Sequence, residues 1–438
     1  MPFWALRAMI LYDVIPANAG IQGLIRVSLI ISAARNNVVF LFNPRCRKGN
    51  KLLSMNSKEP GFSTKAIHAG QDPEERTGAV TVPLFLTTTY AQHTLGEHVK
   101  YDYGRTINPT RESWETSIAA LENGKFGFAF ASGMSAIAAA MSVVGTGDHV
   151  IAGSDMYGGT YRYFSKLLSP LGVEFSYVDM REMASVHDAI KMNTRLVYSE
   201  TPTNPMMNLT DLRALGKIAK DAGIISVVDN TFMSPYLQQP LDLGIEIVVH
   251  SATKYLGGHS DVLGGAVVTS NAEIAEKIKF YQNAYGAVPS PFDCWLMLRS
   301  VKTLALRMDA HSKNAQIIAG HLAKDRRIKK IFYPGLPSHP QHDLARSQMK
   351  DFGGMISIEL GSIENARKFT GALKYFTLGE SLGGVESLVC HPLTMTHGSV
   401  PEARRNELGI TPGLVRLSVG VEDVADLIED IERGLETI

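Results

Sequence analysis

The chain has 438 residues, of which 45% are hydrophobic and 20% are charged, as in ordinary globular proteins with two or three domains. Lys plus Arg number 43, as do Asp plus Glu, so the formal net charge is zero. A neutral chain gives no support to a nucleic-acid or membrane partner, and the sequence contains no apolar run of the roughly 18 residues that a membrane span needs.

The three cysteines, Cys46, Cys294 and Cys390, are scattered along the chain and form no Cys-x-x-Cys pair. This pattern is typical of proteins from a reducing compartment. We therefore expect a cytoplasmic protein that has neither a disulfide framework nor a metal site.

Residues 1–54 differ in composition from the rest, because Asp13 is their only acidic residue against seven basic ones. Ala17-Asn18-Ala19 resembles the end of a signal peptide, although Asp13 interrupts the short apolar run before it. An acid-poor, Arg-bearing segment is also typical of an organellar transit peptide. We interpret residues 1–54 as an extension outside the main fold, with Met55 as the expected start.

The remaining chain divides into three parts. Residues 55–105 are polar and turn-rich, and we expect an extended arm that contributes to a neighbouring subunit. Residues 106–299 alternate between strand and helix patterns, which predicts a mostly parallel sheet covered by helices. Strands are expected at residues 126–131, 149–152, 195–198, 224–228 and 245–250, and helices at 132–144, 161–169 and 211–222.

Residues 300–438 change character and predict a smaller α+β domain. Helices are expected at residues 308–323, 363–373 and 421–434, and strands at 354–360 and 415–419.

Lys254 ends the tetrad Ser251-Ala252-Thr253-Lys254, which directly follows an expected strand. Ligands of open α/β sheets bind beyond the carboxyl ends of strands, where an amine can form an imine with an aldehyde cofactor. Ser-x-x-Lys is also the nucleophile motif of acyl-serine hydrolases, which need Ser-Asp-Asn and Lys-Thr-Gly as companions. Here the nearest stretches are Ser260-Asp261-Val262 and Lys302-Thr303-Leu304, and neither matches.

Two further strand ends carry residues that could bind other parts of such a cofactor. Asp229 ends an apolar strand, where a carboxylate would keep the pyridine nitrogen of pyridoxal 5'-phosphate (PLP) protonated. Ser132, Gly133 and Met134 open an Ala-rich helix whose N–H groups favour a phosphate, and Gly133 permits close approach. An anion nest, a carboxylate and an amine at three strand ends together indicate PLP.

From about Gly61 to its end the chain resembles the Cys/Met-metabolism PLP enzymes, the cystathionine γ-lyase and γ-synthase family. The stretches that carry the resemblance occur in the family's order: Tyr103-Gly104-Arg105, Asn108-Pro109-Thr110-Arg111, Asp155 to Thr160, Glu200 to Pro205, Asp229 to Phe232, Ser251 to Asp261, Glu380 to Gly384, Met395-Thr396-His397 and Arg416 to Gly420.

This resemblance implies an aminotransferase-like fold (fold type I) and a role for each matching residue. Lys254 would carry PLP and Asp229 would pair with its ring nitrogen, while Tyr157 would stack on the ring and assist proton transfer. The expected phosphate ligands are Gly133, Met134, Ser251 and Thr253, with Tyr103 and Arg105 from a neighbouring subunit. Arg416 would bind the substrate carboxylate, with Asn204 and Ser381 alongside. The resemblance further implies a homotetramer built from two dimers.

Asp102 and Glu380 bear on the reaction, because they resemble acids proposed to recognise the distal amino group of cystathionine or cysteine. Methionine γ-lyases have apolar residues there and a cysteine at the position of Gly159. We therefore expect an amino-acid substrate and a cystathionine γ-lyase, which yields cysteine, 2-oxobutanoate and ammonia. Cystathionine γ-synthase and cystathionine β-lyase remain alternatives, and an acyl-serine hydrolase is the alternative from another class.

Overall fold

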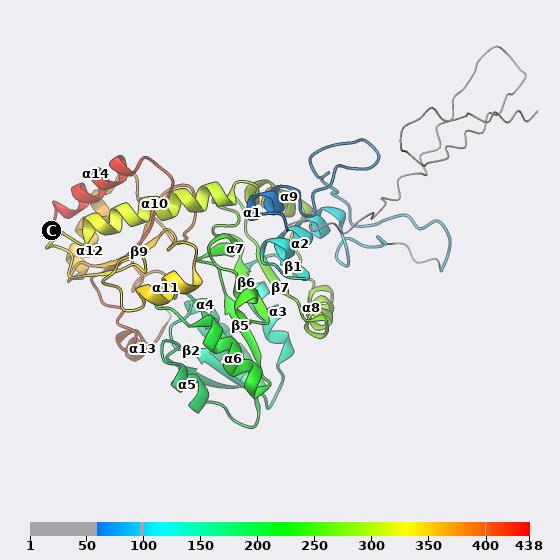
Figure 1. Cartoon of the computed structure of the whole chain (residues 1–438), viewed down its shortest axis with the longest axis horizontal. Coiled ribbons are helices and arrows are strands. Elements are labelled where there is room, and N and C mark those ends of the chain that lie inside the picture. The colour runs from blue at the N-terminus through cyan, green and yellow to red at the C-terminus, as the bar shows by residue number, and fades with distance from the viewer. Residues whose placement is uncertain (1–58, 97–99, 399) are drawn as a thin grey trace, which may run out of the picture. The chain divides into compact units, whose positions relative to one another are not determined.

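The structure is a computed structural model that describes residues 59–96, 100–398 and 400–438 (Figure 1). The chain separates into two units, and the fold below belongs to the unit Pro60–Ile438. The expectations for residues 1–54 and for a start at Met55 lie outside the described residues.

The larger of two β-sheets has seven strands in the described part of the chain, in the order β1-β7-β6-β5-β4-β2-β3. β7 pairs antiparallel with both neighbours, and every other pair in this sheet is parallel. The carboxyl ends of β1 to β6 therefore share one edge, which confirms the expected mostly parallel sheet. The strands are β1 (Phe126–Phe130), β2 (His149–Gly153), β3 (Glu174–Val178), β4 (Thr194–Glu200), β5 (Ile225–Asp229), β6 (Ile247–Ser251) and β7 (Gly265–Thr269).

Sequence patterns predict neither β3 nor β7. β3 forms an edge of the sheet, and its side chains are exposed or half-buried without alternation. β7 is buried along all five residues, a run too short for periodicity to separate a strand from a helix.

Helices cover both faces of this sheet. Successive side chains of a strand point to opposite faces, so neighbouring residues of β2 pack against helices on opposite sides. Val150 and Ala152 join the core that includes α3 (Gly133–Ala140) and α8 (Ala272–Tyr285). Ile151 joins the opposite core, with α5 (Met183–Asp188) and α6 (Leu212–Ala222). The other helices of this region are α2 (Pro109–Leu121), α4 (Gly158–Tyr163), α7 (Ser234–Leu237) and α9 (Pro291–Val301).

Two predicted helices are found with shifted ends. α6 begins after Asp211, whose carboxylate accepts the N–H of Ala214 at 3.0 Å and so caps the helix. The helix predicted over residues 132–144 is α3, which continues as a 3₁₀ turn over Met141–Val143.

The segment expected to be an extended arm contains one helix, α1 (Phe62–His68), and is otherwise irregular in its described residues. Its end is fastened by Arg111 of α2, a side chain only 2% exposed. The Arg111 guanidinium donates hydrogen bonds to the carbonyls of Gly104, Arg105 and Thr106. One buried cation thus binds three consecutive carbonyls where the arm joins the large domain.

The second sheet is smaller and has the order β10-β11-β12-β9-β8. α12, α14 and the long helix α10 pack with it around a separate core, at the opposite end of Figure 1 from α8. The strands are β8 (Lys330–Phe332), β9 (Met355–Glu359), β10 (Thr377–Leu378), β11 (Leu388–Cys390) and β12 (Leu414–Ser418). The helices are α10 (Leu304–Leu322), α11 (His342–Gln348), α12 (Ile363–Ala372), α13 (Glu402–Glu407) and α14 (Val424–Leu435). No helix among the described residues is long and apolar enough to cross a membrane.

A buried polar cluster ties α2 to the strands that lead into the site. Glu122 caps the end of α2 and is fully buried, and its Oε1 lies 2.5 Å from Nε2 of His250 in β6. The same oxygen accepts a hydrogen bond of 3.0 Å from the Asn230 side chain, which directly follows β5. Glu122 therefore fixes the ends of two neighbouring strands from one side.

We predict that Glu122→Ala lowers the free energy of unfolding by about 3–5 kcal/mol, because it leaves buried partners without their acceptor. Denaturant unfolding of the purified protein measures this change. Glu276→Ala, on the exposed face of α8, is the control and should stay within about 0.5 kcal/mol of the parent. Equal stability of the two variants would contradict the prediction.

Candidate active site

A cavity of about 300 Å³ opens at the carboxyl edge of the large sheet, against the smaller sheet. Its wall combines residues that lie far apart in the sequence. They are Ser132, Gly133, Met134, Ile137, Tyr157, Glu200, Asn204, Asp229, Thr231, Phe232, Ser251, Thr253, Lys254, Leu263, Glu380, Ser381, Leu382, Thr396 and Arg416. The structure thus brings together eleven of the predicted site residues, those on the main body of the chain.

Lys254 follows β6 and its Nζ donates a hydrogen bond of 3.0 Å to Oγ of Ser381, which belongs to the smaller domain region. The pKa of Lys254 is lowered to about 8, first by burial and then by the Arg416 charge, while the Glu380 charge acts in the opposite direction. An amine with this pKa is partly neutral near neutral pH and can act as a nucleophile or a base.

The hydrogen bond of Lys254 also bears on the acyl-serine alternative. That chemistry needs a hydrogen bond between the lysine amine and the hydroxyl of Ser251. In the structure the amine donates its hydrogen bond to Ser381 instead. Within the tetrad, the backbone N–H of Lys254 donates a hydrogen bond of 3.2 Å to the carbonyl of Ser251. The structure gives this alternative no support.

Asp229 ends β5 and is 7% exposed. Thr231 donates both its N–H, at 3.0 Å, and its hydroxyl, at 2.5 Å, to Oδ1 of Asp229. The Thr231 hydroxyl in turn accepts the N–H of Ser251 at 2.8 Å, which links β5 to β6. Burial raises the pKa of Asp229 and outweighs the opposing hydrogen bonds from Thr231. A cation in the cavity would favour the charged form of this carboxylate.

The amino end of α3 faces the start of the Lys254 loop at close range. Ser132 caps this helix by accepting the N–H of Ser135, which leaves the N–H groups of Gly133 and Met134 at the open end. A Cβ on Gly133 would lie 2.7 Å from Cβ and 2.8 Å from Oγ of Ser251. Only glycine allows this approach, which places helix N–H groups beside the serine hydroxyl as an anion site requires.

Tyr157 stands at the start of α4, after β2, and its ring is 39% exposed. A Cβ on Gly159 would lie 2.4 Å from the Tyr157 ring, so the ring folds over the first turn of the helix. The ring lines the cavity and is free to cover a ligand there.

Arg416 lies on β12, is 1% exposed, and reaches the cavity from the smaller sheet. Its Nη1 donates to Oδ1 of Asn204 and its Nη2 to the carbonyl of Ser381, both at 2.8 Å. Nε is buried and has no hydrogen-bond partner among the described residues. An oriented guanidinium with a spare donor is suited to a carboxylate.

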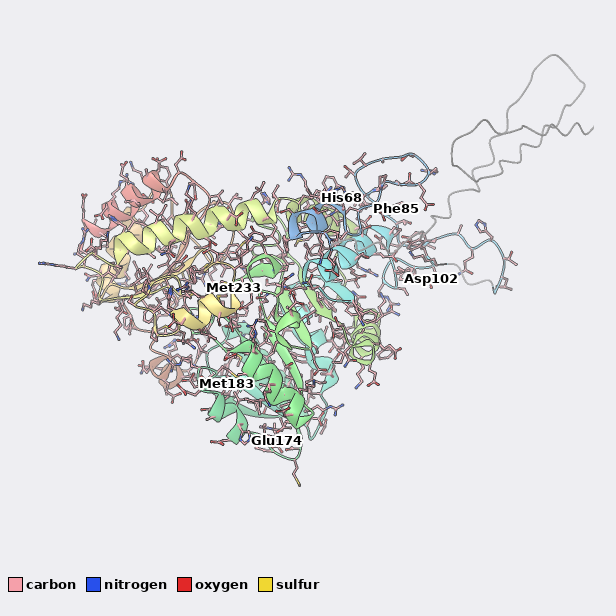
Figure 2. The ribbon with its side chains drawn as sticks, in the orientation of Figure 1. His68, Phe85, Asp102, Glu174, Met183 and Met233 are labelled. Carbon is pink, nitrogen blue, oxygen red and sulfur yellow. The ribbon has the colours of Figure 1, made fainter. Side chains whose placement is uncertain are left out.

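The structure does not bring Asp102, Tyr103 and Arg105 to the cavity of their own chain. All three side chains are exposed, and Asp102 lies on the arm side of the molecule in Figure 2. Arg105 donates instead to the carbonyl of Asn283 at 2.8 Å and lies over the Tyr103 ring.

The sequence does not predict several of the residues that line the cavity. Glu200 and Thr231 lie inside stretches that the family resemblance rests on, yet no role was predicted for either. Apolar wall residues such as Ile137, Phe232 and Leu263 carry no chemical signal, so sequence reasoning had no means to find them. In the described residues, no group of three or more His, Cys, Asp or Glu is placed to hold a metal ion.

Comparison with known proteins agrees with this geometry. The family model described as Cys/Met metabolism PLP-dependent enzyme matches residues 63–436. A cystathionine γ-lyase of Bacillus subtilis is 52% identical over 375 residues, which are 86% of this chain and 99% of that protein. A cystathionine β-lyase of Coxiella burnetii is 49% identical over 387 residues, 88% of this chain and 100% of that protein. The crystal structure of cystathionine γ-lyase from Lactobacillus plantarum complexed with L-serine gives a TM-score of 0.84 at 47% identity and covers 86% and 99% of the two chains.

The donor set of the cavity fits PLP. Lys254 supplies an amine for the aldehyde, and Asp229 supplies a carboxylate for the ring nitrogen. The end of α3, together with the hydroxyls of Ser251 and Thr253, supplies donors for the phosphate. Each part of the cofactor therefore has chemically matched residues within one cavity.

We predict that the apo-protein takes up PLP faster as pH rises and that the rate levels off above about 8, since only neutral Lys254 attacks the aldehyde. Arg416→Gln removes the positive charge, raises the pKa of Lys254 and should move the curve to higher pH. Glu380→Gln should move it to lower pH. The absorbance of the near-visible band that forms when PLP binds measures the uptake. Arg367→Gln, on the exposed face of α12, is the control and should leave the curve unchanged. Identical curves for all variants would refute this electrostatic account.

Gly133→Ala should weaken PLP binding, because the new Cβ pushes α3 away from Ser251. We expect a loss of about 1–3 kcal/mol in binding free energy, as for other overpacked positions. Titration of the apo-protein with PLP measures it. Gly371→Ala is the matched control, since a Cβ there meets nothing within 4 Å; equal affinities for the two variants would show that close approach is not required.

Proposed function

The chain belongs to the Cys/Met metabolism PLP-dependent enzyme family, and we propose that within it the protein is a cystathionine γ-lyase. The proposed reaction converts L-cystathionine and water to L-cysteine, 2-oxobutanoate and ammonia. Relatives that share about half of their residues with this chain carry both the γ-lyase and the β-lyase name. The names of these relatives therefore agree on cystathionine as the substrate and differ in which bond to sulfur is broken.

One observation carries the choice of substrate: the same cavity holds a buried cation and an exposed anion, Arg416 and Glu380. The Arg416 guanidinium lines the cavity and is suited to bind the α-carboxylate of an amino acid. The Glu380 carboxylate lines the same cavity and would attract a distal ammonium group. Both act electrostatically on Lys254, which is consistent with a substrate that extends past this amine from one charged group to the other.

The residues divide the chemical work as follows. When bound, PLP supplies an electron sink that stabilises negative charge at Cα of the substrate. Arg416, steadied by Asn204, orients the carboxylate so that the Cα proton faces Lys254. Neutral Lys254 accepts this proton, and it is the base available for the proton at Cβ as well. Tyr157, whose side chain lines the cavity, would assist by protonating the departing thiolate.

Two related reactions would use the same groups. A β-lyase breaks the bond between Cβ and sulfur, and a γ-synthase expels an acyl group from an O-acylhomoserine and adds cysteine. All three share the first proton transfer to Lys254. They differ in which later bond is broken and in whether the remaining fragment is hydrolysed or reacts with cysteine. Glu380 favours a substrate that already carries a second amino group.

We further propose that the arm, residues 55–105, completes the cavity of a second copy. Asp102, Tyr103 and Arg105 lie outside the cavity of their own chain, and the arm exposes apolar side chains, among them Val80, Leu86 and Leu95. Exposed apolar surface of this kind favours association. A homotetramer of two such dimers, with residues 106–299 as the large domain and residues 300–438 as the small one, is the proposed assembly.

We predict that the PLP-loaded enzyme, given L-cystathionine alone, releases 2-oxobutanoate and cysteine in equal amounts. Mass spectrometry of the keto acid measures the outcome. Pyruvate with homocysteine would contradict the γ-lyase and establish the β-lyase. No keto acid, together with cystathionine formation from cysteine and an O-acylhomoserine, would establish the γ-synthase.

Lys254→Ala is the control for the chemistry and should abolish turnover, whereas Lys277→Ala, on the exposed face of α8, should keep it. Full activity of Lys254→Ala would refute the assignment of Lys254 as the base.

A further inference from the structure

Glu200 is a cavity residue to which neither the family resemblance nor the proposed reaction gives a role. It is the last residue of β4 and is 5% exposed. Its Cα is the register partner of the Cα of Asp229, the last residue of β5. On its other side β4 pairs with β2, the strand that leads into the Tyr157 loop.

The two carboxylate oxygens of Glu200 hold two different loops. Oε2 accepts the backbone N–H of Tyr157 at 2.9 Å. Oε1 accepts the backbone N–H of Asn204 at 3.1 Å. A single buried carboxylate therefore joins the loop that carries the cavity's aromatic ring to the loop that carries the Arg416 partner.

The second of these loops leads directly to the carboxylate-binding group. Oδ1 of Asn204 accepts a hydrogen bond from Nη1 of Arg416, and the Arg416 side chain lines the cavity. A change in the position of Asn204 therefore changes the direction of the guanidinium. Because Arg416 is fully buried, it has little freedom to compensate.

Burial and the neighbouring Asp229 raise the pKa of Glu200, whereas the N–H groups of Tyr157 and Asn204 lower it. A buried acid at this cost is retained only where its hydrogen bonds serve the structure or the site. Here both bonds go to loops that line the cavity.

We propose that Glu200 is a positioning residue that sets the Tyr157 ring and the Asn204–Arg416 carboxylate clamp in one fixed relation through its two backbone hydrogen bonds. Both hydrogen bonds of Glu200 to these loops go to backbone N–H groups, so it acts through the main chain. This positioning role of Glu200 does not depend on which reaction the cavity catalyses on an amino acid.

Amide hydrogen exchange of the protein, without substrate, tests the two bonds directly. Glu200→Gln keeps the shape of the side chain but offers one acceptor oxygen, so one of the two amides loses its partner. Exchange of the segment that contains Tyr157, or of the one that contains Asn204, should then accelerate about 10- to 100-fold. Glu276→Gln on α8 is the matched control and should change neither segment.

A second variant, Glu200→Asp, keeps the charge but is one methylene shorter and cannot reach both loops. It should also expose at least one of the two amides while the smaller domain region, including α12, stays protected. Unchanged exchange at both segments in both variants would overturn the proposal. Faster exchange along the whole chain, or failure of both variants to fold, would assign Glu200 to general stability and overturn it as well.

Steady-state kinetics provide the functional readout, and this part alone rests on the proposed function. Glu200→Gln should raise KM for the amino-acid substrate about tenfold or more, with a smaller change in kcat, because the clamp is displaced. In an Asn204→Ala background the same substitution should change KM less than about twofold, since the route to Arg416 is already broken. If Glu200→Gln raises KM by the same factor in both backgrounds, Glu200 does not act on Arg416 through Asn204. If the parent enzyme does not turn over cystathionine at all, the proposed function is refuted, but the hydrogen-exchange result still tests the role of Glu200.

Discussion

The parallel pairing of β4, β5 and β6 is the constraint on which the site depends. Parallel strands end at the same edge of a sheet, so Glu200, Asp229 and Ser251 become neighbours although tens of residues separate them along the chain. β7 lies antiparallel between β6 and β1, so β1 runs in the same direction as β6, ends at the same edge and delivers α3 to it. The chemistry of the cavity follows from which residue stands last on each strand.

Burial gives these groups their properties. A lysine amine, a guanidinium and two carboxylates lie in one small volume, and desolvation opposes the charge on each of them. Hydrogen-bond partners offset this cost for three of the four groups. Thr231 supports Asp229, two backbone amides support Glu200, and Asn204 supports Arg416. Lys254 has only a serine hydroxyl, and so the amine remains the most reactive of the four.

The smaller sheet closes the cavity and decides what can enter it. β12 presents Arg416 from within its own core, and the segment before β11 presents Ser381 and Glu380. The hydrogen bonds of Asn204 with Arg416, and of Lys254 with Ser381, cross between residues that are more than a hundred positions apart. The substrate-binding residues that we propose therefore depend on how the two sheets are held together, while the proposed cofactor residues lie at the ends of strands in the larger sheet.

Local patterns in the sequence determine much of this protein. Apolar runs flanked by turns predict the central strands, and the family motifs predict Lys254, Asp229, Gly133 and Arg416, because the types of residue that this chemistry needs are few. Local patterns do not predict β3 and β7, since an unalternating edge strand and a five-residue buried run carry no distinct period. Only the tertiary structure decides the partners: that Lys254 bonds Ser381, that Glu200 joins two loops, and that Asp102, Tyr103 and Arg105 stay outside the cavity of their own chain. The physical reason is that hydrogen bonding and desolvation depend on distances in space, which the order of residues along a chain does not contain.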